Sequence, residues 1–187
     1  MALDLLERYR THHCMFNDDI QGTAATALAG MFGAMRALGK KKQALNDQRF
    51  LVCGAGSAGM GVVDMIRKAM IRMGLSPEAA SERFYILDGE GLITTKRRGL
   101  ASHVTPFMQK DETKDRLGLV ETIKYARPTV MLGLTGAGKI WTQEVLETIG
   151  KVTERPILFP MSNPISKMEC SSEEAQQVSE MTRGGYG

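Results

Sequence analysis

The chain has 187 residues, a length that suits one domain or a domain with appendages. Hydrophobic residues make up 43% and charged residues 24%, which is typical of a globular protein that buries its own core without metals or disulfides. The net charge of +3 is too small to favour a nucleic-acid partner. The sequence contains no run of about 18 apolar residues, the length that a membrane-spanning helix needs.

Secondary structure was predicted from apolar periodicity and from capping residues. The chain opens inside an amphipathic helix over 3–10, and we expect a truncated start rather than a signal peptide. Thr23 is the expected N-cap of a long helix that runs to about Leu38 and stops at Gly39. Further helices are predicted over 58–74, 77–83, 117–126 and 142–149, with a last one capped by Ser171 or Ser172 before a glycine-rich end that should fray from Gly184.

Four short apolar runs, over 49–53, 84–87, 129–133 and 156–159, are predicted to be strands. They alternate with helices and are continuously apolar, as buried parallel strands are. We therefore predict an α/β fold of the Rossmann type, a doubly wound, mostly parallel sheet with helices on both faces. The three cysteines Cys14, Cys53 and Cys170 form no CxxC pair, which favours a reducing intracellular compartment, cytoplasm or organelle matrix.

A GxGxxG segment lies between the first predicted strand and the next helix, the context that dinucleotide binding requires. It reads Gly54-Ala55-Gly56-Ser57-Ala58-Gly59. Gly54 would permit the tight turn, Gly56 would let a pyrophosphate approach the backbone, and Gly59 would let helix and strand pack closely. The N–H groups at the helix start would then face the anion.

Asp88 ends the second strand, where a carboxylate binds ribose hydroxyls or simply serves the turn before Gly89. It lies 29 residues after Gly59, and the fingerprint expects about 20; the extra helix near Pro77 accounts for the excess. Asp88 favours NAD because it repels a 2′-phosphate. The basic run 96–98 would instead accept that phosphate, or is only a solvated run, so NAD and NADP both stay open.

Two more loops should border the same crevice, because adjacent parallel strands end on the same side of a sheet. Thr135 and Gly136 follow the third strand, and Asn163 follows the fourth. They would flank a cofactor, or serve only as turn residues.

Asp18 and Asp19 are adjacent, so their side chains should diverge, one toward a metal ion and the other toward a base, unless both are simply solvated. The stretch Phe16-Asn17-Asp18-Asp19-Ile20-Gln21-Gly22-Thr23-Ala24 closely resembles a signature of malic enzymes. The resemblance continues in family order through the glycine loop, residues 87–92, residues 133–138 and Ser162-Asn163-Pro164 with Glu169-Cys170, and it covers residues 3–180.

The resemblance implies a dinucleotide-binding domain over 1–187, with the metal-site segment in 1–24, of an enzyme that converts malate to pyruvate and CO₂ with NAD or NADP and Mg²⁺ or Mn²⁺. Asp19 would be a metal ligand, and Asp18 a catalytic-site residue that supports the lysine base. Gly54, Gly56, Ser57, Ala58, Gly59 and Asp88 would bind the dinucleotide, Thr135 and Gly136 would line its nicotinamide side, and Asn163 would contact nicotinamide and substrate.

The resemblance also implies absences and an assembly. Nothing in this sequence matches the family's lysine base, its tyrosine acid or its other metal ligands. The 187-residue chain alone should therefore bind cofactor without oxidising malate. The full enzyme would be a homo-oligomer with no nucleic-acid or membrane partner. Two alternatives remain: the NAD-binding domain of another dehydrogenase, such as an amino-acid dehydrogenase, or a non-catalytic dinucleotide-sensing module that uses Met31 and Met35 as an interface stripe.

Overall fold

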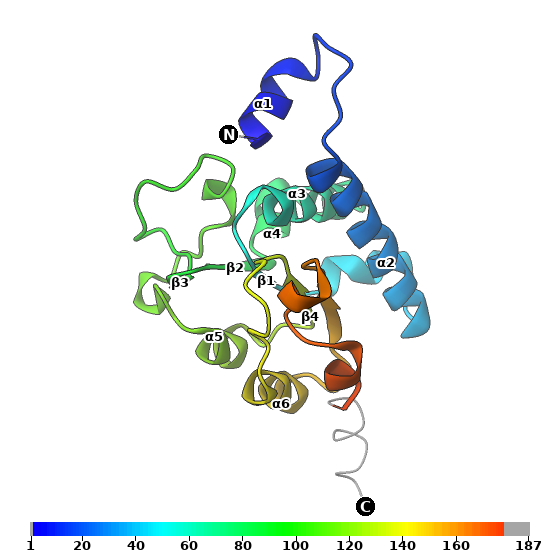
Figure 1. Ribbon diagram of the computed structural model, residues 1–187, viewed down its shortest axis with the longest axis vertical. Helices are drawn as coiled ribbons and strands as arrows, with labels where there is room; N and C mark the ends of the chain where they lie inside the picture. Colours follow the sequence, from blue (N-terminus) through cyan, green and yellow to red (C-terminus); the bar gives the residue numbers. More distant parts are fainter. Residues whose placement is uncertain (1, 178–187) are drawn as a thin grey trace, which may run out of the picture. The chain divides into compact units, whose positions relative to one another are not determined.

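The computed structural model describes residues 2–177, so the expected fraying from Gly184 lies outside the described residues. By its contacts the chain divides into two compact units, one formed by residues up to Asp47 with Gly56–Ser81 and the other by Gln48–Ala55 with the chain from Glu82 on. Figure 1 traces the elements in chain order. The helices and strands are α1 (Ala2–Tyr9), η1 (Asp18–Gly22), α2 (Thr23–Ala37), η2 (Lys42–Asp47), β1 (Phe50–Cys53), α3 (Ser57–Arg72), α4 (Pro77–Ser81), β2 (Phe84–Asp88), β3 (Gly91–Leu92), η3 (Thr105–Phe107), η4 (Glu112–Lys114), α5 (Leu119–Ala126), β4 (Val130–Gly133), α6 (Gln143–Val152), β5 (Ile157–Pro160) and η5 (Ile165–Lys167).

The sheet has five strands in the order β3-β2-β1-β4-β5. The four predicted strands are all present and pair in parallel, with Cys53 opposite Leu87 on one side and Gly133 on the other. The fifth strand, β3, was not predicted and pairs antiparallel with β2 at the edge. The mostly parallel α/β sheet is confirmed, and its carboxyl ends bring the loops after β1, β2, β4 and β5 to one edge.

One face of the sheet packs on α5 and α6, which lie next to each other in Figure 1. Every second strand residue points toward these helices, and the strand residues on this face are apolar. Trp141 and Cys53 are part of it, and the Trp141 indole N–H donates to the Cys53 sulfur at 3.5 Å. The buried members of this cluster are Leu51, Cys53, Leu87, Leu92, Ile123, Met131, Trp141, Val145, Leu146, Ile149 and Cys170.

The opposite side chains of the strands are buried as well, and β1 is buried at all four positions. Phe50 stacks on Phe84 at 4.9 Å between ring centroids, and Phe107 of η3 meets Phe84 edge to face. Aromatic pairs in these geometries stabilise a core beyond their buried area. Burial on both faces explains why the strands read as unbroken apolar runs.

In the other unit, α2 and α3 pack together. Met31 and Met35 are fully buried on α2, so the interface stripe considered for them is wrong and they are core residues. Thr23 is not an N-cap either, because its backbone is already helical. A π-helical turn, η1, precedes α2 without a break, and Asn17 caps that turn by accepting from the Ile20 N–H at 3.1 Å.

The predicted helix starts at 77 and 142 and the predicted end near Leu38 agree with the structure to within one residue. Ser76 accepts from the Ala79 N–H at 3.1 Å at the start of α4, and Thr142 caps α6 through the Val145 N–H at 3.5 Å. Gly39 has a φ of +68°, a left-handed conformation typical of the residue after a helix. Among residues 2–177, no helix is long and apolar enough to cross a bilayer.

Candidate dinucleotide site

The glycine loop follows β1 directly and leads into the 16-residue helix α3, as predicted. Gly54 has a φ of +116°, and a Cβ there would lie 2.5 Å from the Leu134 carbonyl oxygen. Its N–H donates to the Leu87 carbonyl at 2.9 Å, across to β2. Glycine is therefore required at position 54 by the fold itself, for both conformation and space.

Gly56 differs from Gly54, because nothing in the described chain requires a glycine there. Its φ is −75°, and a Cβ built on it would meet no heavy atom within 4 Å. Gly56 is the N-cap of α3, yet no side chain caps this helix start in the part of the chain that the structure describes. Backbone N–H groups at an uncapped helix start, reached past a residue without a side chain, suit an anionic group.

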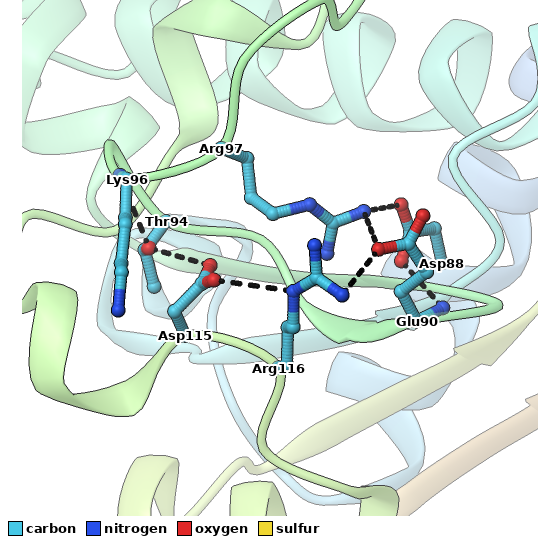
Figure 2. Close-up of polar contacts among 7 residues, drawn as sticks. All are labelled: Asp88, Glu90, Thr94, Lys96, Arg97, Asp115 and Arg116. Atoms are coloured by element: carbon cyan, nitrogen blue, oxygen red, sulfur yellow. Dashed lines mark hydrogen bonds and ion pairs between the residues drawn. The ribbon is translucent and has the colours of Figure 1, made fainter.

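Asp88 lies at the carboxyl end of β2, where the sequence placed it. Its Oδ2 accepts from Arg97 Nη2 at 2.5 Å, and its Oδ1 accepts from the Glu90 N–H at 2.9 Å. Figure 2 shows Arg97 reaching Asp88 and Glu90 while Arg116 approaches Glu90 from the other side, at 2.9 Å. The side chain of Asp88 is 23% exposed, so the carboxylate serves its turn and still meets solvent.

The basic run 96–98 is not a solvated run throughout, so that interpretation is wrong for its middle residue. Arg97 has only 7% of its side chain exposed, and Asp88 and Glu90 both engage its Nη2. Arg98 is exposed and donates to the Thr95 carbonyl. The guanidinium of Arg97 thus acts as a counter-ion for the carboxylate that ends β2 (Figure 2).

The loops after β4 and β5 are joined by Glu169, which the sequence analysis named only as part of a family segment and gave no role in the site. Glu169 is fully buried. Its Oε1 accepts from the Thr135 N–H and hydroxyl, both at 3.1 Å, and from the Ser162 hydroxyl at 2.6 Å. A Cβ on Gly133 would lie 2.4 Å from the Glu169 carboxyl carbon, so the glycine that ends β4 leaves the space for this carboxylate.

Thr135, Gly136 and Asn163 are all exposed on these two loops, and none of them is part of the core. Gly136 has a φ of +64°, which favours glycine. Its N–H donates to the Ser162 hydroxyl at 2.9 Å, so Gly136 and the residue beside Asn163 are held together. The two loops therefore meet at the same edge of the sheet, as the parallel order requires.

Asp18 and Asp19 lie on η1, and both are exposed. The Asp18 carboxylate lies over Gly22, where a Cβ would meet its Oδ1. Ile20, next to Asp19, packs against α3 at Gly61, where a Cβ would be 2.8 Å from the Ile20 Cγ2. Gly61 was not noticed in the sequence, although it lies only two residues beyond the predicted motif.

The described residues were compared with the ligand set that a metal ion needs. Within residues 2–177 no three His, Cys, Asp or Glu side chains gather so as to hold one. Asp19 contributes one exposed carboxylate, and Mg²⁺ or Ca²⁺ needs several oxygen ligands in addition. The residues that the structure describes therefore do not form a complete metal site by themselves.

The buried thiols are poor nucleophiles. Burial raises the pKa of Cys53 to about 12, although the hydrogen bond from Trp141 opposes this and the charge of Glu169 adds to it. Burial likewise raises the pKa of Cys170 to about 11. Cys14 is exposed, and all three cysteines are free.

Comparison with known proteins was made by family model and by individual sequences. Residues 20–184 match the family model described as the malic enzyme NAD-binding domain. The mitochondrial NAD-dependent malic enzyme of Solanum tuberosum is 42% identical over 95% of this chain and 30% of its own length. The NADP-dependent malic enzyme of Rattus norvegicus is 40% identical over 95% of this chain and, again, 30% of its own length.

Solved structures agree on the fold. The malic enzyme of Pyrococcus horikoshii superposes with a TM-score of 0.73 at 22% identity, over 95% of this chain and 39% of that one. The Entamoeba histolytica malic enzyme gives a TM-score of 0.70 at 22% identity, over 94% of this chain and 34% of that one. The chain thus spans about a third of the length of the proteins it matches.

Proposed function

Because the chain belongs to the malic enzyme family, as its NAD-binding domain, we propose that it binds NAD or NADP at Gly54–Gly59 for the oxidative decarboxylation of malate. Hydride would pass from malate to the nicotinamide, and the resulting β-keto acid would lose CO₂ to give pyruvate. The protein's part is to hold and orient the cofactor, which accepts the electrons. An amino-acid dehydrogenase is the less favoured alternative, since both family model and relatives are malic enzymes.

The observation that carries the proposal is the open space at Gly56. Its backbone angle is ordinary, its missing side chain would touch nothing, and α3 begins there without a side-chain cap. Neither packing nor conformation explains a glycine at this position. Close approach of a pyrophosphate to the helix start does explain the glycine, because phosphate oxygens accept hydrogen bonds from the free N–H groups there.

The remaining roles follow the family resemblance. Asp88 would bind the adenosine ribose, Ser57 and Ala58 the pyrophosphate, Thr135 and Gly136 the nicotinamide side, and Asn163 nicotinamide and substrate. Asp19 would be one ligand of a Mg²⁺ or Mn²⁺ ion, and Asp18 would support the base. Thr135, Gly136 and Asn163 on the loops and Asp18 and Asp19 on η1 are exposed, and Ser57, Ala58 and Asp88 at the start of α3 and the end of β2 are partly exposed, which suits contact with a ligand.

We propose NAD as the preferred cofactor of this chain. A 2′-phosphate needs a cation close to the ribose, and the guanidinium of Arg97 is already engaged by Asp88 and Glu90. Glu90 adds a second negative charge near the same point, which repels a phosphate further. Equal affinity for NAD⁺ and NADP⁺ would contradict this preference.

The proposed binding is tested with Gly56→Ser. Serine is a favoured N-cap in the extended conformation seen at position 56, so the folded chain should be as stable as the wild type or more so. Its side chain would occupy the space proposed for the pyrophosphate, and we expect at least a tenfold loss of NAD⁺ affinity by titration calorimetry. Undiminished NAD⁺ binding by the variant would contradict the site.

We further propose that these 187 residues alone do not oxidise malate, since no three His, Cys, Asp or Glu side chains within residues 2–177 gather to hold a metal ion and the chain spans 30% of the length of the Solanum tuberosum relative. Formation of reduced nicotinamide with malate and Mn²⁺, in a clean preparation, would contradict this. The whole enzyme would assemble as a homo-oligomer. Its compartment would be a reducing one, cytoplasm or organelle matrix, which is consistent with three free cysteines and with mitochondrial and chloroplastic relatives.

A further inference from the structure

We infer that Glu169 is the positioning residue for the nicotinamide side of the site, an inference that rests on the proposed cofactor binding. Glu169 contacts no proposed ligand itself. It lies beneath the loops after β4 and β5, fully buried, and its side chain is aimed into the space that Gly133 leaves by having no Cβ. It therefore acts through the residues it holds.

Three successive backbone amides of the β4 loop depend on this one carboxylate. The Thr135 N–H donates to it directly at 3.1 Å. The Gly136 N–H donates to the Ser162 hydroxyl at 2.9 Å, and that hydroxyl donates to Glu169 at 2.6 Å. The Ala137 N–H donates to the Thr135 hydroxyl at 3.1 Å, which also donates to Glu169.

The chemistry of a carboxylate fits this arrangement. A hydroxyl has one proton and two lone pairs, whereas an ionised carboxylate can only accept. Because Glu169 accepts hydrogen bonds from the hydroxyls of Thr135 and Ser162, the lone pairs of both hydroxyl oxygens are free to accept from the loop amides. A glutamine would present an NH₂ group to part of this set, and at least one donor would then face another donor.

The β5 loop is fixed by the same residue. The Ser162 N–H donates to Oε2 of Glu169 at 3.3 Å, one residue before Asn163. The backbone adds two more links between the loops, from the Lys139 N–H to the Met168 carbonyl at 2.7 Å and from the Trp141 N–H to the Glu169 carbonyl at 3.0 Å. Thr135, Gly136 and Asn163 thus hold one relative geometry before any cofactor arrives.

Glu169→Gln in this 187-residue chain tests the inference when two ligands are compared. ADP-ribose contains every part of NAD⁺ except the nicotinamide. We expect NAD⁺ to bind roughly tenfold more weakly to the variant, because a buried donor loses its acceptor, while the affinity for ADP-ribose stays within twofold of the wild type. Fluorescence of Trp141, the single tryptophan, reports whether the variant is folded.

Glu154→Gln is the matched control, because Glu154 is exposed before the amino end of β5 and the substitution changes the charge equally. It should change neither affinity. Ser162→Ala serves as a second variant, since it removes the hydroxyl between Gly136 and Glu169 but keeps the carboxylate, and it should also weaken NAD⁺ alone.

An equal loss for NAD⁺ and ADP-ribose, or no loss for either, would overturn the positioning role. A wild-type chain that binds neither ligand would instead refute the proposed function, and this inference with it. The two failures are distinguishable because the first is read from the variants and the second from the wild type alone.

Discussion

Replacing Asp88 by Asn isolates the charge of the carboxylate that ends β2. The amide keeps the shape of the side chain and can still accept the Glu90 N–H, which is bound at 2.9 Å. Only the negative charge facing Arg97 at 2.5 Å is lost. Arg97 is then left buried, and its Nη1 already has no hydrogen-bond partner within residues 2–177.

The expected cost follows from burial. Removing one partner of a fully buried pair costs about 3–5 kcal/mol, because the other charge stays desolvated. Asp88 keeps 23% exposure, and Glu90 remains 3.5 Å from the same guanidinium nitrogen, so part of the charge is still compensated. We therefore expect a loss of about 2–3 kcal/mol, which corresponds to roughly 4–12 °C in melting temperature for a chain of this size.

Glu82→Gln is the matched comparison, because Glu82 and Lys110 form an ion pair of the same 2.5 Å length in which both side chains are exposed. Exposed ion pairs contribute little to folding stability, so this variant should have the same melting temperature as the wild type. Glu90→Gln should fall between the two, since its contact with Arg97 is longer and its side chain is 56% exposed. Equal melting temperatures for Asp88→Asn and Glu82→Gln would refute the argument from burial.

Two further predictions concern packing and thiols. Gly61→Ala should lower the free energy of unfolding, measured in urea, by about 1–3 kcal/mol, because the new Cβ would be 2.8 Å from Ile20. Gly33→Ala, which places a Cβ in open space on α2, is the control and should not destabilise the fold. Equal effects of the two substitutions would contradict the close contact at Gly61. In the folded chain a thiol reagent at pH 8 should modify Cys14 alone, and unfolding should expose all three thiols. Because burial raises the pKa of Cys53 from 9.0 to about 12, the unfolded chain loses this proton first, and stability should fall as pH rises from 9 toward 12; a flat profile there would contradict it.

The sheet could be predicted because its signals are local. β1, β2 and β4 are apolar runs that end at or next to a glycine or an aspartate, β5 is an apolar run that ends at Pro160, and parallel order follows from alternation with helices. β3 was missed because Gly91–Leu92 has two residues and no periodicity. The start of α2 was misplaced because a capping threonine was expected, whereas the chain continues from η1 with Asn17 as the cap.

The candidate site was predicted from a spacing along the chain and from the ends of strands. The glycine loop has such a spacing, and its expected place between β1 and α3 is confirmed. Glu169 lies 34 residues from Thr135, and Arg97 lies 9 residues from Asp88 across a turn. A buried charge has no signature of its own in a sequence, because its burial is tolerated only through partners that the fold supplies.

The distance from the glycine loop to Asp88 illustrates why strand register matters more than spacing. The count exceeds the usual fingerprint because α4 (Pro77–Ser81) lies between α3 and β2. The register of β1 with β2 nevertheless pairs Cys53 with Leu87, and the Gly54 N–H donates to the Leu87 carbonyl. Asp88 therefore ends its strand beside Gly54 however many residues intervene. Since a ribose carboxylate must lie one strand away from the pyrophosphate loop, an insertion before β2 leaves its position unchanged, whereas a one-residue shift of β2 against β1 would displace it.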